Sequence, residues 1–269
     1  MKKIICLLIA IGLGTYALSY VKSTPKKGRV TYIYTTTFKG IPMPREAVLT
    51  FDQYESLFVH SQGKAPKIFD RSGNEVSYET MTTTNVANKG VMFGLYFQDP
   101  IGNVYYKNSK TQEMIFREIV INKPFLVKEP EWLEFDWKLG MERKQIGNFS
   151  CLSATTYFRG RTYKAWYTPE IPLSLGPWKF HGLPGLILEV EDDKQEVSFK
   201  AQSVEIPQEQ IDAIAPPEKG EKVSLESFME AEYRILSEMQ KAEQAMREGK
   251  EGNFTYAKDE IVKVEMKLD

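Results

Sequence analysis

The order of apolar and polar residues along most of this chain follows the two-residue period of β-strands. Residues 29–38 (RVTYIYTTTF) are rich in β-branched and aromatic side chains, which favour strands. Residues 46–61 divide into two short strands around a polar turn at 52–53. Residues 94–130 extend the pattern into a meander whose turns contain Asp, Pro, Gly, Asn and Ser. The first half of the chain therefore predicts antiparallel strands joined by short turns.

The second half continues the same pattern after one irregular stretch. Residues 61–90 are polar and turn-rich, and we expect a long loop or flap there. Residues 133–172 alternate again and contain a tight hairpin turn at 159–160, while 186–206 predict a further hairpin. Residues 255–269 predict a final strand.

One segment changes to a helical period. From Ser224 to Glu248, apolar residues recur at three- and four-residue spacing, and Ser224 and Gly249 are suited to cap the two ends. We expect this amphipathic helix to pack on the sheet, although a helix that binds a partner would have the same pattern. The apolar positions are Leu225, Phe228, Met229, Ile235, Leu236, Met239, Ala242 and Met246.

Many strands and one main helix indicate a mainly β (α+β) protein. The sequence predicts a curved antiparallel sheet or incomplete β-barrel, covered by one amphipathic helix at about 224–248. Such a sheet would enclose an apolar cavity. Residues 30–269 form a single domain in this interpretation.

The N-terminus has the layout of a secretory signal peptide. Lys2 and Lys3 precede an apolar run from 4 to 13, and the small residues Ala17 and Ser19 favour cleavage after Ser19. Residues 20–29 are then a basic spacer. The apolar run is short for a membrane span, so an uncleaved anchor is the weaker alternative. We expect an exported protein of the periplasm or cell envelope, peripheral to the membrane rather than integral.

Charge and cysteine content narrow the function classes further. Lys and Arg number 35 against 36 Asp and Glu, so the chain has no strong net field to attract nucleic acid or an anionic membrane, and we expect no nucleic-acid partner. After cleavage only Cys151 would remain, which excludes a disulfide within the chain. Cys151 lies in a strand-like segment and is expected to be a small buried apolar residue.

Residues with catalytic or metal-binding potential are few. The chain has two histidines, His60 and His181, and neither has a metal-ligand spacing, so we expect no metal and no cofactor. A nucleophile–base pair of Cys151 and His181 is the enzymatic alternative, and it requires the two side chains to meet. The carboxylate pairs lie in turn-like contexts and are expected to be solvated. These pairs are Glu129 with Glu131 and Asp192 with Asp193.

Residues 176–190 (GPWKFHGLPGLILEV) combine prolines, glycines and aromatics before an apolar strand. Prolines restrict the residues before them and glycines permit unusual backbone angles, so 168–184 should be a stiff, extended loop. Either the loop turns a corner of the sheet, or it lies at a rim and presents side chains to a ligand. The candidate ligand-binding residues in the second case are Trp166, Tyr167, Trp178, Lys179 and His181.

The same run resembles the hallmark of the GLPGLI family of exported Bacteroidota-type proteins, named for the hexapeptide at 182–187. Residues 144–151 (KQIGNFSC) and 158–161 (FRGR) are similar to further elements of that family. The resemblance implies export and a mostly β domain, and it points to no particular function. Its motif residues, which we expect to be structural, are Gly176, Pro177, Gly182, Leu183, Pro184, Gly185, Leu186 and Ile187.

These observations favour a non-enzymatic envelope domain that binds an apolar or extended ligand, such as a lipid or peptide, or an envelope protein. The alternatives are an envelope assembly factor that acts through the helix at 224–248, and an enzyme that uses Cys151 and His181.

Overall fold

The computed structural model describes residues 27–38, 41–60, 68–69, 75–76, 99–120, 123–208, 210–211 and 213–248. The expected signal peptide, the capping Gly249 and the expected final strand lie outside the described residues. So does most of the polar stretch at 61–90.

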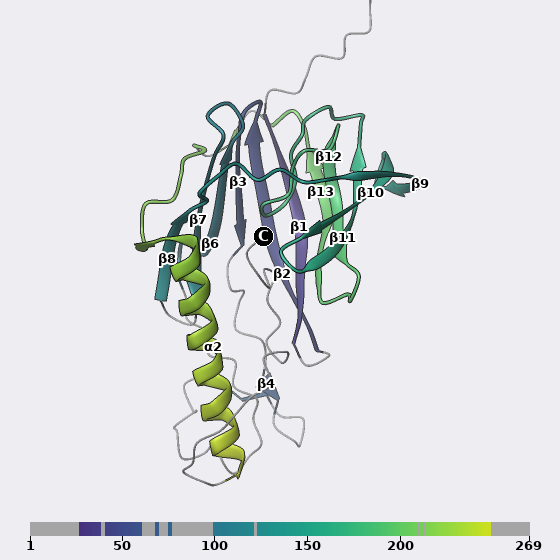
Figure 1. Cartoon of the computed structure of the whole chain (residues 1–269). Coiled ribbons are helices and arrows are strands. Elements are labelled where there is room, and N and C mark those ends of the chain that lie inside the picture. Colours follow the sequence, from purple (N-terminus) through teal and green to yellow (C-terminus); the bar gives the residue numbers. More distant parts are fainter. Residues whose placement is uncertain are drawn as a thin grey trace, which may run out of the picture.

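The described residues form two sheets and one helix (Figure 1). The small sheet pairs β4 (Ile68–Phe69) with β5 (Glu75–Val76), and the helix is α2 (Leu225–Glu248). The large sheet contains β1 (Lys27–Phe38), β2 (Ile41–Asp52), β3 (Glu55–His60), β6 (Asn103–Asn108), β7 (Glu113–Val120), β8 (Lys123–Lys128), β9 (Lys138–Ile146), β10 (Phe149–Phe158), β11 (Arg161–Thr168), β12 (Leu186–Asp192), β13 (Val197–Glu205) and β14 (Glu221–Val223).

The large sheet has twelve strands in the order β14-β8-β7-β6-β3-β2-β1-β13-β12-β11-β10-β9. Its neighbours pair antiparallel, except that β14 runs parallel to β8. The two edge strands, β14 and β9, do not pair with each other, so the sheet stays open. The expected mainly β fold is confirmed, but the sheet does not close into a barrel. The sequence pattern did not predict β14, the parallel strand at the edge.

Most of the expected strands and turns are present where the pattern predicts them. The expected hairpin turn lies between β10 and β11, where Arg159 and Gly160 both have positive φ (43° and 92°). Two adjacent residues with positive φ are what a tight two-residue hairpin turn requires. At the N-terminal side, β1 starts at Lys27, within the segment that the sequence assigns to the spacer.

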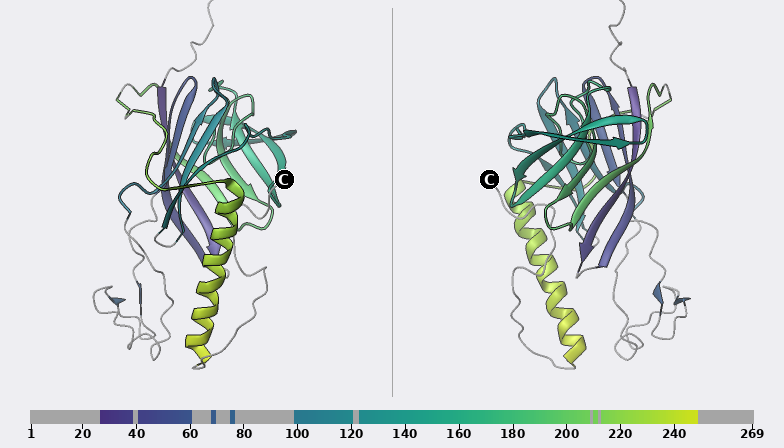
Figure 2. Two further views of the ribbon diagram at one scale, coloured as in Figure 1. Left: turned by 60° about the vertical axis from the view of Figure 1, so that its left-hand side comes forward. Right: turned by 90° about the vertical axis from the view of Figure 1, so that its right-hand side faces the viewer.

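A single connection forces the sheet to curl. Residues 129–137, which we call the strap, join β8 to β9, and these strands are ten positions apart in the sheet. A flat sheet would separate them by ~48 Å at about 4.8 Å per strand. The strap can span at most ~36 Å from the end of β8 to the start of β9. The two sides of the sheet must therefore bend toward each other, and Figure 2 shows the resulting deep curve.

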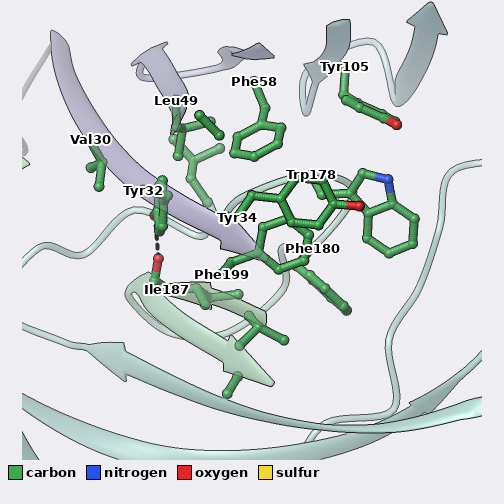
Figure 3. Packing of buried hydrophobic residues seen from close by; sticks show 14 of the residues in the cluster. Val30, Tyr32, Tyr34, Leu49, Phe58, Tyr105, Trp178, Phe180, Ile187 and Phe199 are labelled. Atoms are coloured by element: carbon green, nitrogen blue, oxygen red, sulfur yellow. Dashed lines mark hydrogen bonds between the residues drawn. The ribbon is translucent and has the colours of Figure 1, made fainter. Parts of the chain in front are cut away.

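The concave side of the curved sheet holds the hydrophobic core (Figure 3). Alternate residues of β1, Val30, Tyr32 and Tyr34, point into it and are buried, as the two-residue period of a strand demands. Tyr32 donates a hydrogen bond from its hydroxyl to the Ile187 carbonyl oxygen at 2.6 Å, which links β1 to β12 across the interior. The core is strongly aromatic, so its packing depends on ring contacts.

The helix covers only one side of the sheet. The Ser224 hydroxyl accepts a hydrogen bond from the Ser227 backbone N–H at 3.1 Å, which confirms the expected N-cap. Phe228 packs edge-on against Phe116 of β7 and Phe125 of β8, with ring centroids 5.4 and 5.6 Å apart. The rest of α2 runs beyond the ends of β7 and β8 (Figure 1). Within the described part of the chain, no helix has the length and apolarity needed to cross a membrane.

Candidate ligand-binding site

The loop with the GLPGLI-like motif enters the interior of the sheet. Residues 175–181 (LGPWKFH), which we call the buried loop, are all buried. Phe180 lies edge-on against Tyr163 at 4.9 Å and against Trp178 at 5.2 Å. Figure 3 shows Trp178 and Phe180 among the core side chains, which include Phe199 and Tyr105. The loop thus fills much of the concave interior that the sequence led us to expect as a cavity.

A buried loop exposes no backbone to water, so its polar groups need partners within the protein. Lys107 of β6 supplies two of them, because its Nζ donates to the carbonyl oxygens of Gly176 and Phe180 at 2.8 Å each. Burial lowers the pKa of Lys107 to about 7. The indole N–H of Trp137, in the strap, donates to the His181 carbonyl oxygen at 2.8 Å. Hydrogen bonds from both β6 and the strap therefore hold the loop.

A buried ionic cluster connects the loop to the strap a second time. Lys179 places its Nζ 2.5 Å from one carboxylate oxygen of Glu129, and Arg159 places an Nη 2.8 Å from the other. Burial by itself would raise the pKa of Glu129, but the charges of Lys179 and Arg159 outweigh it and hold that pKa below its usual range. The cluster joins the strap, the buried loop and the β10–β11 turn.

Two of the acids expected to be solvated turn charges are buried instead. Glu129 and Asp192 are each 2 % exposed, whereas their neighbours Glu131 and Asp193 are exposed. Asp192 forms an ion pair at 2.5 Å with Arg161. The expectation was wrong for Glu129 and Asp192 because it considered only local sequence. Their cationic partners come from residues about 30 positions or more away.

A pocket of about 420 Å³ opens beside the strap. This volume falls in the range typical of small-ligand sites. Its walls come from the strap, from the β2–β3 and β6–β7 turns and from the end of the buried loop. The lining residues are Gln53, Ser109, Trp132, Leu133, Glu134, Phe135, Ser174, Leu175, His181 and Gly182.

His181 forms part of the pocket wall in its neutral form. Burial and the charge of Lys107 lower its pKa to about 3. Its Nδ1 lies 3.1 Å from the Lys179 carbonyl oxygen, so Nδ1 carries the proton and Nε2 is left as an acceptor. The ring packs edge-on against Trp132 at 4.4 Å and Phe135 at 5.3 Å. Three rings thus form one aromatic wall.

The five candidate ligand-binding residues do not lie together. His181 lines the pocket, whereas Trp178 and Lys179 point into the core and are buried. Tyr167 is also buried in the core. Trp166 lies on the opposite face of β11, where Lys144 and Lys164 lie 5.5 and 5.0 Å from its ring centroid.

The strap residues of the pocket carried little sequence signal. Trp132 and Phe135 lie in a short acidic run at the start of the segment that the sequence predicts as strand, and the structure places this run in the strap instead. Gln53 and Ser109 are ordinary turn residues. Only the curl of the sheet brings these turns beside His181.

Cys151 is buried, as expected, and its described hydrogen-bond contact is to the Phe149 carbonyl oxygen, 3.8 Å from the sulfur. Burial, with the charges of Glu189 and Glu170, raises the pKa of its thiol to about 11. A thiol nucleophile requires the opposite shift. Among the described residues, no group of three or more His, Cys, Asp or Glu side chains is placed to hold a metal ion.

Comparison with solved structures shows a likeness of fold. Two crystal forms of PNGF-II are each 15% identical to this chain and cover 78% and 77% of it, with TM-scores of 0.50 and 0.48. This chain spans about a third of the PNGF-II chain (34% and 33%). A LolA superfamily protein from Nitrosomonas europaea is 8% identical, with 69% of this chain and 88% of that chain covered and a TM-score of 0.27.

No curated protein matches the sequence. One family model does, over residues 158–189, which include β11, the buried loop and the start of β12. The family is described as a protein of unknown function (Porph_ging), so the segment that fills the core of this protein is also the segment that is similar to that family.

Proposed function

We propose that this chain is an exported, non-enzymatic binding domain of the cell envelope, and that it holds one group of an apolar or extended ligand in the pocket beside the strap. The observation that carries the proposal is the division of the concave side into a filled interior and an open pocket. Trp178 and Phe180 occupy the interior, while Trp132, Phe135 and His181 form an aromatic wall next to polar groups. Apolar walls with a few polar groups are typical of ligand sites.

The envelope location rests on the sequence. The N-terminal 19 residues have the pattern of a signal peptide, and the motif at 182–187 resembles that of the exported GLPGLI proteins. The match to the family of unknown function over 158–189 covers the same motif. A lipid or a peptide would suit the pocket if one end of it enters while the rest stays outside.

The two alternatives have less support. Cys151 has a raised thiol pKa and no described contact with His181, which disfavours an enzyme that uses this pair. An assembly factor that acts through α2 would need a free apolar stripe. The apolar side chains of α2 from Leu225 to Leu236 pack instead against the core, apart from Tyr233.

Native mass spectrometry of the protein purified from its own envelope would test the proposal. We expect a bound small molecule in the wild type that is lost in Trp132→Ala and retained in Trp166→Ala, because Trp132 lines the pocket and Trp166 lies on the opposite face of the sheet. No bound molecule in the wild type, or equal occupancy in both variants, would contradict it.

A further inference from the structure

Among the described residues that line the pocket, the one formally charged side chain is acidic. The lining contains Glu134 and no lysine or arginine. Glu131 and Asp136 lie exposed on the same strap, and the strap sequence EPEWLEFDW contains no basic residue. Glu134 forms no ion pair with any described residue. Among the described residues that line the pocket, an anionic ligand group would therefore meet Glu134 and no cation.

The nearby cations are engaged elsewhere. Lys179 is paired with Glu129 in the interior, and Lys107 donates to two backbone carbonyls of the buried loop. Lys110, on the β6–β7 turn, lies over the ring of Tyr54 at 5.8 Å. None of the three lines the pocket.

The aromatic wall adds a second attraction for positive charge. The faces of tryptophan and phenylalanine rings carry partial negative charge, and a cation within about 6 Å of a ring centroid is stabilised. Trp132 and Phe135 both lie against His181, so the three rings line one connected surface. This protein already uses the same interaction in its core, where the Lys179 ammonium lies 3.9 Å from the centroid of Phe116.

The remaining polar atoms include several hydrogen-bond acceptors. His181 donates through Nδ1 to the Lys179 carbonyl oxygen, so its Nε2 can only accept. The side-chain oxygens of Gln53 and Ser109 can also accept. A primary ammonium group offers N–H donors and no acceptor. A quaternary ammonium has no N–H, so only the carboxylate and the aromatic faces would attract it.

We propose that the pocket binds an alkylammonium group, a primary or quaternary amine carried on an apolar body, with Glu134 as its counter-ion and Trp132 and Phe135 as its aromatic contacts. This inference deepens the proposed function and rests on it. The pocket has room for on the order of a dozen water molecules at ~30 Å³ each, which suits such a group rather than a whole lipid.

Isothermal titration calorimetry on the full chain tests the charge preference. The probes are choline, its neutral isostere 3,3-dimethylbutan-1-ol, n-butylamine and butanoate, all with the same buffer and salt. We expect both amines to bind, the neutral isostere to bind about tenfold more weakly than choline, and butanoate not to bind. Nα-acetyl-lysine methylamide and glycerophosphocholine then separate a peptide lysine from a lipid headgroup as the source of the amine.

Variants connect binding to the proposed contacts. Glu134→Gln should weaken choline binding about fivefold, since an exposed ion pair contributes little more than that. Trp132→Ala should weaken it tenfold or more. The control Glu131→Gln removes a neighbouring strap charge that does not line the pocket, and it should leave choline binding within twofold of the wild type.

The outcomes separate the two proposals. If the neutral isostere or butanoate binds as tightly as choline, and Trp132→Ala abolishes that binding, the ammonium inference fails while the binding function stands. The inference also fails if Glu131→Gln and Glu134→Gln have equal effects. If no probe binds the wild type, the ammonium inference is overturned, and mass spectrometry of the native protein decides the binding function independently.

Discussion

At the scale of single residues, Gly185 shows why the motif requires glycine. A Cβ at this position would lie 2.2 Å from the carbonyl oxygen of Thr168, which is the last residue of β11. No side chain can yield there, because the obstacle is backbone. The glycine therefore permits the return of the chain from the buried loop into β12 at the point where β12 pairs with β11.

Gly185→Ala should lower the free energy of unfolding by about 3 kcal/mol, because relief of the clash must displace the backbone of β11. Urea unfolding would measure it. The control is Gly147→Ala, where φ is +55° but no atom lies within 4 Å of the added Cβ. We expect about 1 kcal/mol there, from backbone strain alone. If Gly185→Ala and Gly147→Ala lost the same free energy of unfolding, the predicted cost of placing a Cβ against the Thr168 carbonyl would be wrong.

His181 links stability to pH. The pKa of its imidazole is about 3 in the folded protein and ~6.5 in an unfolded chain. Between these values the unfolded chain binds a proton that the folded chain does not, so acid favours unfolding. The contribution of His181 is complete above pH ~6.5 and is lost as the pH falls toward 3.

We therefore expect the wild-type free energy of unfolding to fall by up to ~1.4 kcal/mol per pH unit through this group between pH 6.5 and 4.5. His181→Gln should show a shallower fall over the same window, measured by urea unfolding at each pH. His60 is present in both proteins and so cancels in the comparison. Parallel profiles for the two proteins would refute the assignment.

At the scale of elements, the strap and the buried loop depend on each other through Glu129. Its carboxylate lies between the ammonium of Lys179 and the guanidinium of Arg159, and all three side chains are buried. A buried ionic group contributes little net stability while it is paired, but removal of one partner leaves the others uncompensated.

Glu129→Gln should thus cost about 3–5 kcal/mol in the free energy of unfolding. The matched control is Glu142→Gln, which removes an exposed carboxylate that pairs with Lys164 at 2.8 Å. We expect less than about 1 kcal/mol for the control. Denaturant unfolding of both variants measures the difference, and similar small losses would show that the buried cluster does not hold the strap.

At the scale of the whole molecule, stability should be uneven across the sheet. β1 lies inside the sheet order, pairs on both sides, and buries Val30 and Tyr32 completely. β9 is an edge strand with one neighbour, and its residues are exposed except Ile146, which is partly buried. Local opening of β9 would therefore expose little apolar surface.

Hydrogen exchange followed by mass spectrometry should show this difference directly. We expect the amides of β1 and of the buried loop to exchange only through global unfolding, and those of β9 to exchange orders of magnitude faster. Fast exchange in the buried loop would mean that the loop opens on its own, and that the interior of the sheet is accessible after all.

Much of the fold could be predicted because strands and helices have local causes. The two-residue period of a strand puts Tyr163, Ala165 and Tyr167 on one face and Trp166 on the other, and the first three are buried in the core. The hairpin turn at Arg159 and Gly160 and the helix cap at Ser224 depend on neighbouring residues only. Each of these features follows from backbone geometry within a few residues.

The site could be predicted only in part. His181 is a candidate from the sequence and lines the pocket, whereas Trp132, Phe135 and Gln53 are not among the candidates, since no feature of their local sequence points to a ligand site. The turn-like context of Glu129 predicts a solvated acid, and the partners that bury it lie 30 and 50 residues away, beyond the reach of any local pattern. A strap long enough to bridge a flat sheet would have created no pocket at this place.

Local sequence patterns suffice to predict the mainly β class, most strand and turn positions, the start of the helix and a stiff loop before β12. All of these depend on period, turn chemistry and the restrictions of proline and glycine. Long-range packing, in contrast, sets the entry of the loop into the interior, the binding of its carbonyls by Lys107, and the pocket between two distant turns, the strap and the end of the buried loop. Those outcomes depend on the curvature of the twelve-stranded sheet, because a short strap must join β8 to β9. No local pattern in the sequence encodes that curvature.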